Sequence, residues 1–312
     1  MDKLWAMAVF ARVAEIGSFT RAAEALDMAN ASVTTCVRGL ERSLGVTLLH
    51  RDTRRLRLTE EGEAYLGHVR EILGAVETAE ADVQSRLGAL SGRLVIETPI
   101  SFGHAILCPA LPVFAARYPG IATMVTLTNQ PHHLIERAID VAIRMDRVED
   151  AELVARPIYE ARYVLCCAPA LAATLPAQVS ELDPKLCLGV LPQEQPVSNH
   201  WVLGEGDGAV TIRPQGALHF NSSDALIAAA QAGVGLIHVL DIFTHRAIAD
   251  GSLVAVYPEL DLRRKTFYAV STRARLAAAK VRAFNDFLTE VVDAERRPSS
   301  LAPVAVRSIG RR

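Results

Sequence analysis

The chain has 312 residues, of which 50% are hydrophobic and 5% aromatic, and its formal net charge at pH 7 is −2. This length suits two or three domains, and the near-neutral charge excludes a polycation that binds nucleic acid over its whole surface.

The cysteines and the apolar runs indicate where the protein works. Five cysteines without regular spacing do not form a disulfide framework, so we expect a reducing, cytoplasmic setting. The first residues, with Asp2 and Lys3 on an amphipathic helix, do not read as a signal peptide. The most apolar run, residues 225–240, is too short and too broken by polar residues and glycines to span a bilayer. We therefore expect no membrane association.

Three short helices are expected in the first 45 residues. Apolar residues at positions 4, 7, 10, 11 and 14 form one face of the first helix, which Gly17 ends. Ser18 is a good N-cap for the second helix, and Gly45 suits the end of the third. A tight turn at residues 27–30 joins the second helix to the third.

The outward face of the third helix is polar. Asn30, Ser32, Thr34, Thr35 and Arg38 lie on it, and all can hydrogen-bond to base edges or phosphates in a major groove. The same spacing also fits any small helical hairpin, because helix-turn-helix patterns are short and degenerate.

Residues 46–58 are predicted to form a two-stranded wing that turns near residues 52–54. Six arginines between positions 38 and 57 face only Glu41 and Asp52, a local excess of four positive charges. A basic patch on a neutral chain is typical of an attached DNA-binding module, although a solvated charged loop would look the same. The wing could place Arg51, Arg54, Arg55 and Arg57 on the phosphate backbone.

A long helix is expected over residues 59–90, capped by Thr59 and roughly 48 Å long at 1.5 Å per residue. Its apolar residues follow a near-heptad spacing at positions 69, 72, 76, 79, 83, 87 and 90. We interpret this seam as a dimerisation surface; the alternative is a helix packed along its own second domain.

Beyond Ser91 and Gly92 the pattern alternates between strands and helices, which favours an α/β domain with a parallel sheet. Strands are expected at residues 94–96, 123–128, 140–144, 162–168, 234–240 and 267–271, and helices at 103–118, 132–138, 225–232 and 274–292. Two such lobes would hold a small ligand in the cleft at the carboxyl ends of their strands. The tail after residue 296 is expected to be disordered.

The pattern of the first sixty residues closely resembles the N-terminal signature of the LysR-type transcriptional regulators. The residues that carry it are Leu4, Phe10, Gly17-Ser18-Phe19, Ala22-Ala23, Leu26, Val33, Leu40-Glu41, Leu44-Gly45, Leu48-Leu49, Arg51, Arg54 and Leu58-Thr59-Glu60-Glu61-Gly62. The later segments Thr98-Pro99, Pro109-Ala110-Leu111-Pro112, Asp140-Val141-Ala142-Ile143-Arg144 and Gly233-Val234-Gly235 are similar to that family's effector domain.

This resemblance implies an α/β protein with an N-terminal all-α winged helix-turn-helix (1–58), a dimerising linker helix (59–91) and a two-lobed effector domain like periplasmic binding proteins (92–296), before the tail (297–312). It implies a homotetramer, a dimer of dimers, on double-stranded promoter DNA. A small-molecule effector would then change promoter bending and the recruitment of RNA polymerase.

The resemblance also implies which residues form the two sites. DNA contacts are expected from Ser18, Thr20, Asn30, Ser32, Thr34, Thr35, Arg38, Arg51, Arg54 and Arg55. For the effector, Ser101 and Thr128 match positions that line the family's cleft, and we expect Ile100, Phe102, Asn221, Ser222 and His238 as their neighbours.

Several positions depart from the family's pattern. Ala29 replaces the usual Ser or Thr cap of the recognition helix, for which Asn30 or Ser32 could substitute, and Thr35 and Cys36 replace a common basic residue and a glutamine. Asn129 and His133 stand where related members often have Asp, which would suit an anionic effector such as a carboxylate. Arg144 could pair with that anion, but a salt bridge within its own lobe is the simpler expectation.

Other chemistries remain as alternatives. Cys166 and Cys167 could belong to a thiol enzyme or a thiol-responsive regulator, although their apolar strand favours buried structural thiols. His104 and Cys108 are four residues apart without a second metal-binding pair, and residues 204–208 form a glycine-rich turn rather than a nucleotide loop. A solute-binding protein and an α/β enzyme with a helical appendage complete the alternatives. We expect no cofactor, no metal and no catalytic residue.

Overall fold

A computed structural model describes residues 2–51, 56–85, 90–135, 137–145, 148, 150–191, 200–204, 209–260 and 263–295. The expected wing turn with Arg54 and Arg55, the seam residue Leu87 and the tail 297–312 lie outside this range, as do the side chains of Arg51 and Val83.

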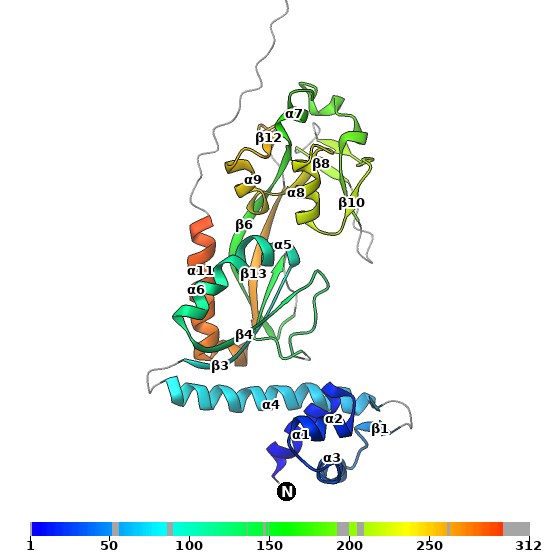
Figure 1. The fold of residues 1–312 in the computed structure, drawn as a ribbon, viewed down its shortest axis with the longest axis vertical. Coiled ribbons are helices and arrows are strands. Elements are labelled where there is room, and N and C mark those ends of the chain that lie inside the picture. The colour runs from blue at the N-terminus through cyan, green and yellow to red at the C-terminus, as the bar shows by residue number, and fades with distance from the viewer. Residues whose placement is uncertain are drawn as a thin grey trace, which may run out of the picture.

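Three helices and a small hairpin form the N-terminal unit, drawn in blue in Figure 1. The helices are α1 (Lys3–Ile16), α2 (Phe19–Ala25) and α3 (Asn30–Leu44), and the hairpin pairs β1 (Leu49–Arg51) with β2 (Leu56–Leu58). Phe10, Val33 and Leu40 are fully buried where α1 and α3 pack together. The three expected helices and the wing strands are confirmed; Asn30, assigned to the turn, is the first residue of α3.

Helix α4 (Glu60–Ser85) lies between this unit and the C-terminal domain (Figure 1). The expected helix end at residue 90 is wrong, because Leu90 is not helical and packs against the core of the first lobe. Thr59 caps α4 as expected: its Oγ accepts the amide hydrogen of Gly62 at 2.9 Å and donates to the Thr47 carbonyl at 2.8 Å. Gly62 is needed at this crossing, because a Cβ built on it would lie 2.0 Å from the carbonyl oxygen of Leu48.

The first lobe of the C-terminal domain is a sheet covered by helices. Strands β3 (Ser91–Thr98), β4 (Gly120–Leu127) and β5 (Val141–Met145) run parallel, and β13 (Arg264–Thr272) pairs antiparallel with β5. A continuous helical segment runs through α5 (Ile100–Phe102), a π-helical turn (Gly103–Leu107) and α6 (Cys108–Arg117), and α10 (Arg273–Leu276) and α11 (Ala279–Glu295) follow β13. The sheet is therefore mixed. The expected parallel pairing is found for β3, β4 and β5, whereas β13 runs antiparallel because the chain returns from the second lobe in the opposite direction.

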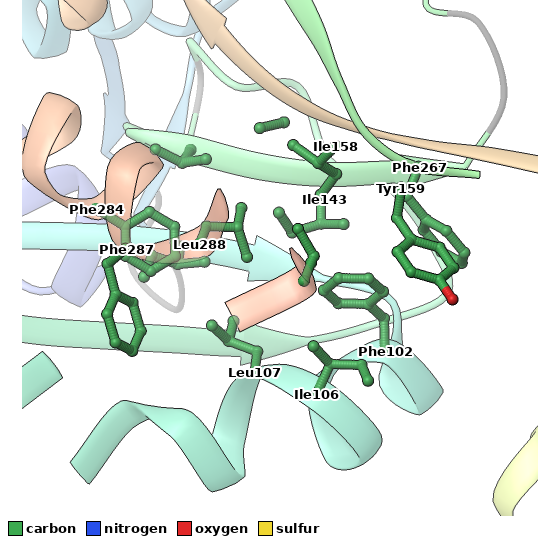
Figure 2. Packing of buried hydrophobic residues seen from close by; sticks show 14 of the residues in the cluster. Phe102, Ile106, Leu107, Ile143, Ile158, Tyr159, Phe267, Phe284, Phe287 and Leu288 are labelled. Atoms are coloured by element: carbon green, nitrogen blue, oxygen red, sulfur yellow. The ribbon is translucent and has the colours of Figure 1, made fainter. Parts of the chain in front are cut away.

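Aromatic side chains fill the space between these helices and the sheet (Figure 2). Phe114 of α6 meets Phe284 and Phe287 of α11 at ring-centroid distances of 5.5 and 5.1 Å. Among the described residues, only the segment Ile100–Arg117 is long and apolar enough to cross a membrane by length and composition. Its Phe102, Leu107 and Phe114 are fully buried in this core, as expected for a core helix.

The second lobe is built on the far half of β6 (Leu153–Cys167), which pairs there with β11 (Ile237–Leu240) and β12 (Val254–Val256). Two small pairs complete it, β7 (Gly189–Val190) with β10 (His219–Phe220) and β8 (Trp201–Leu203) with β9 (Val210–Ile212). Its helices are α7 (Pro169–Ala172), α8 (Ser223–Gln231) and α9 (His245–Ala249), with 3-10 turns at Val179–Glu181, Pro184–Leu186 and Asp241–Phe243.

Two strands connect the lobes. The near half of β6 pairs antiparallel with β13, with a register shift between Phe267 and Tyr268, and both strands run from one lobe toward the other (Figure 1). The expected strand at residues 162–168 is thus only the far end of a strand of 15 residues.

The expected helix at residues 132–138 is wrong, because the described residues of this segment, 132–135 and 137–138, form irregular structure and turns. The segment is held by tertiary contacts instead, since the amide of His132 donates to Oε1 of Glu97 at 3.2 Å. The sequence pattern did not reveal this contact, because Glu97 lies 35 positions away in the chain.

A buried charge cluster lies where the first lobe approaches α4. Asp140, 2% exposed, forms an ion pair with Arg275 and lies 3.6 Å from Nζ of Lys280. The Arg275 pair is made by Oδ1, whereas Oδ2, the oxygen near Lys280, also accepts the amide hydrogen of Val95 at 2.8 Å. Arg275 also lies close to α4: a Cβ built on Gly74 of that helix would be 3.1 Å from Nη2 of Arg275.

Candidate functional site

Helices α2 and α3 present a polar surface. Ser18 caps α2, accepting the amide hydrogen of Arg21 at 3.3 Å, and Nδ2 of Asn30 donates to Oγ1 of Thr20 at 3.4 Å. Thr20, Asn30, Ser32, Thr35 and Arg38 are exposed, whereas Ser18 and Thr34 are half-buried. Five of the expected DNA-contacting side chains are therefore accessible from solvent.

No side chain caps α3. Ala29 occupies the N-cap position in an extended conformation and provides no hydrogen bond, and Asn30 reaches Thr20 instead of capping the helix. The bond between Asn30 and Thr20 joins the start of α3 to α2 and so replaces part of what a cap would do.

Glu41 fixes the wing to α3, a role that the sequence analysis did not assign. Its Oε1 accepts the amide hydrogens of Leu48 at 2.9 Å and Leu49 at 3.3 Å. A carboxylate that accepts backbone hydrogens makes strong hydrogen bonds, so Glu41 positions the wing beside the polar face of α3. The sequence signals for it are its place in the family signature and its being one of two acids in an arginine-rich segment.

A cavity of about 480 Å³ lies between the two lobes. Four of the seven expected effector residues line it: Ser101, Thr128, Asn221 and His238. Ile100, Phe102 and Ser222 are not among its lining residues, and Phe102 is fully buried in the core of the first lobe. A volume of this size suits a small molecule.

Hydrogen bonds cross between the lobes at one side of this cavity. The amide of Ser223 donates to Oγ of Ser101 at 3.2 Å, and Nδ2 of Asn129 donates to the carbonyl of Asn221 at 3.0 Å. Oδ1 of Asn129 also accepts the amide hydrogen of Ile100 at 3.1 Å. The amide side chain at position 129 can donate and accept at once, which an aspartate could not do.

Arg144 lines the cavity but its guanidinium is paired within its own lobe. Its Nη2 lies 2.5 Å from Oε1 of Glu97, which is 1% exposed, and Nδ1 of His132 lies 2.5 Å from Oε2. Burial alone would raise the pKa of the Glu97 carboxyl, but the hydrogen bonds from His132 and Arg144 outweigh it and hold that pKa below its ordinary value. The simpler expectation for Arg144, a salt bridge within the lobe, is confirmed, and His133 is exposed outside the cavity lining.

The buried cysteines have unreactive thiols. Burial raises the pKa of Cys166 to about 12, that of Cys167 to about 11 and that of Cys187 to about 12. These thiols stay protonated at neutral pH, and the thiolate is the reactive form. Their expected place in an apolar strand is confirmed for Cys166 and Cys167.

His104, which with Cys108 was considered and set aside as a metal-binding pair, has another partner. Its Nδ1 lies 2.9 Å from Oδ2 of Asp224 in the other lobe. Within the part of the chain that the structure describes, no group of three or more histidine, cysteine or acidic residues could hold a metal ion.

His238 lines the cavity, and its pKa is far from the ordinary value for histidine. Burial, with a smaller contribution from the charge of Arg263, lowers its pKa to about 4. His238 is neutral in the folded chain, whereas in the unfolded chain its imidazole binds a proton more readily. The free energy of unfolding therefore falls as the pH drops from 6.5 toward 4.

We expect His238 to cost about 2 kcal/mol of stability at pH 5 relative to pH 7.5. Replacing it by phenylalanine keeps an aromatic ring of similar shape and should remove this part of the acid sensitivity in thermal melts at the two pH values. The exposed His133→Gln variant is the control and should melt like the parent. Equal acid sensitivity of His238→Phe and the parent would contradict the assignment.

A winged helix-turn-helix, a long connecting helix and a two-lobed domain with a cavity between the lobes together define a ligand-responsive DNA-binding regulator. Residues 4–63 match the family described as "Bacterial regulatory helix-turn-helix protein, lysR family", and residues 87–293 match the "LysR substrate binding domain". The chain belongs to the LysR family, and it is a transcriptional regulator with a DNA-binding and an effector-binding part.

Relatives cover almost the whole chain. An HTH-type transcriptional repressor of Pseudomonas aeruginosa is 30% identical over 98% of this chain and 97% of its own length. The regulator CrgA of Neisseria meningitidis (serogroup B) is 32% identical over 91% of this chain and 95% of its own length, and a solved CrgA structure superposes with a TM-score of 0.60 at 30% identity over 91% and 97% of the two chains. The full-length structure of the virulence activator AphB of Vibrio cholerae superposes with a TM-score of 0.58 at 26% identity, over 92% of this chain and 98% of that chain.

Proposed function

We propose that this regulator is a cytoplasmic homo-oligomer, a dimer of dimers, without catalytic activity of its own. It binds promoter DNA through α3 and the wing and changes promoter bending and RNA polymerase recruitment when an effector occupies the inter-lobe cavity. The domain limits 1–58, 59–91, 92–296 and 297–312 belong to this proposal. The observation that carries it is the exposed polar face of α3 beside a hairpin, joined through α4 to a domain with a cavity.

The proposed DNA contacts are residue-specific. Ser18, Thr20, Asn30, Ser32, Thr34, Thr35 and Arg38 would face the major groove, and Arg51, Arg54 and Arg55 of the wing would contact phosphates. The exposure of Thr20, Asn30 and Arg38 supports this arrangement, and Glu41 supports it by holding the wing.

Arg38→Ala should weaken binding to the DNA flanking the protein's own gene about tenfold, from the loss of about 1–3 kcal/mol at a base or phosphate contact. Mobility shifts at two salt concentrations, followed by footprinting, measure this. Arg12→Ala on α1 removes the same charge from an exposed residue paired with Glu15 and should leave binding unchanged. Equal binding by the parent and Arg38→Ala would rule out α3 as the DNA-reading helix.

The dimerisation seam on α4 is the second part of the proposal. Ile72 is 38% exposed on this helix, and Val76 is half-buried, so apolar surface is available to a partner helix. A heptad-like seam buries such residues in a coiled coil.

Val76→Asp should reduce the oligomer to smaller species in sedimentation velocity, because a carboxylate in an apolar seam lacks a partner. Ala75→Asp adds the same charge one position away from the seam, at an exposed residue, and serves as the control. An unchanged oligomer size for Val76→Asp would favour a helix packed only along its own chain.

The proposed effector is a small carboxylate bound by Ser101, Thr128, Asn221 and His238, with Ile100, Phe102 and Ser222 as neighbours. The described lining contains no aspartate or glutamate that would repel an anion, while it offers hydroxyl and amide groups as hydrogen-bond donors. Screening small acids for a change in the footprint tests this part of the proposal.

A further inference from the structure

Three aromatic rings form one wall of the inter-lobe cavity. Tyr163 comes from β6, His238 from β11 and Trp201 from β8, and all three line the cavity. The rings of Tyr163 and His238 are stacked, with centroids 4.5 Å apart and an interplanar angle of 22°. Trp201 lies 5.5 Å from His238 at an angle of 44°. We call these three residues the aromatic wall.

The imidazole at the centre of the aromatic wall has an unused polar atom. Nε2 of His238 is buried and finds no hydrogen-bond partner in the described part of the structure. A buried polar atom without a partner costs about 1–3 kcal/mol. A ligand hydroxyl can supply the missing bond whichever ring nitrogen carries the proton, because a hydroxyl both donates and accepts.

Arg144, the one arginine in the described cavity lining, is already paired with Glu97. His200, also in the lining, accepts a hydrogen bond at Nε2 from Nε of Arg213 at 3.0 Å. We therefore expect ligand binding at the wall to rely on ring packing and on hydrogen bonds. Offset-stacked and edge-to-face aromatic pairs gain about 0.5–1.5 kcal/mol beyond the burial of their area.

We propose that the effector is a hydroxylated aromatic acid whose ring packs on the aromatic wall and whose ring hydroxyl bonds to Nε2 of His238. This inference rests on the proposed effector site and specifies the chemical class that the site recognises. The carboxylate then lies toward Ser101, Thr128 and Asn221, the polar side of the same cavity.

Titration calorimetry of the full chain with four acids, benzoate, 3-hydroxybenzoate, 4-hydroxybenzoate and cyclohexanecarboxylate, and with phenol tests the class. Cyclohexanecarboxylate has the charge and nearly the size of benzoate but no π-system. We expect at least one hydroxybenzoate to bind about tenfold more tightly than cyclohexanecarboxylate, from ring packing and one added hydrogen bond together.

Two variants separate these contributions. His238→Phe keeps a ring in the wall and loses Nε2, so hydroxybenzoate affinity should fall to that of benzoate while benzoate affinity stays. Trp201→Leu should reduce the affinity of all the aromatic acids but not that of cyclohexanecarboxylate. The chain has two tryptophans, so Trp5→Leu on the exposed face of α1 is the matched control, and ligand quenching of the remaining fluorescence in that variant reports on Trp201.

The outcomes distinguish the inference from the proposed site. Equal affinity for benzoate and cyclohexanecarboxylate overturns the aromatic class and leaves a carboxylate effector in place. Binding of phenol without binding of the acids keeps the aromatic wall but overturns the carboxylate. Absence of binding by all four acids at millimolar concentration overturns the inference, and a footprint that still responds to a non-aromatic acid shows that the proposed site itself survives.

Discussion

Gly62→Ala is expected to unfold the junction between the wing and α4. The added methyl group would lie 2.0 Å from the carbonyl oxygen and 2.9 Å from the carbonyl carbon of Leu48, so the backbone itself must move. Overpacking against backbone costs about 3 kcal/mol or more, and the shift would also break the Thr59 cap. We expect a strongly lowered melting temperature by circular dichroism and loss of DNA binding in mobility shifts.

Gly67→Ala on the same helix is the matched control. A Cβ at Gly67 meets no heavy atom within 4 Å, so this change should stabilise α4 by about 1 kcal/mol through helix propensity. A Gly62→Ala protein that melts and binds DNA like the parent would show that this crossing is not as tight as the structure has it.

Asp140→Ala is expected to destabilise the C-terminal domain by about 3 kcal/mol, because it leaves the partly buried Arg275 and the buried Lys280 without their carboxylate, although Lys280 keeps its hydrogen bond to the carbonyl of Arg93. The amide of Val95 loses its acceptor as well. Urea unfolding of the full chain measures the loss.

Asp286→Ala, on the exposed face of α11, removes an equal charge and should change stability by no more than about 0.5 kcal/mol. Asp140→Asn keeps one acceptor oxygen and should fall between the two. If Asp140→Ala unfolds at the same urea concentration as Asp286→Ala, the cluster does not stabilise the fold.

The N-terminal half could be predicted closely because its signals are local. Caps and helical periodicity depend on residues three or four positions apart, so Ser18, Gly45 and Thr59 mark real boundaries. Two residues of this half were misassigned. The side chain of Asn30 reaches back to Thr20 instead of taking part in the turn, and Leu90, expected as the last residue of the helical seam, packs against the core of the first lobe outside α4.

The C-terminal half was less predictable because its structure depends on distant contacts. The first part of β6 contains Pro157, charged residues and several exposed positions. Its sequence therefore does not show the pattern of a buried strand. The cavity combines Ser101, Tyr163, Trp201 and His238 from four separate segments. Family resemblance indicated Ser101, and His238 was expected as a neighbour of the cleft. No motif marks Tyr163 or Trp201, and only the folded chain brings these residues together.

The two lobes are joined by a pair of hydrogen-bonded strands, β6 and β13, with one register irregularity between Phe267 and Tyr268. Paired strands are twisted rather than flat, so we expect the lobes to change their relative angle through the twist of this ribbon while its pairing is kept. The contacts of Ser101 with Ser223 and of Asn129 with Asn221 favour one angle when the cavity is empty. Effectors of different shape would favour different angles, and the response of the regulator would then be graded rather than all-or-none.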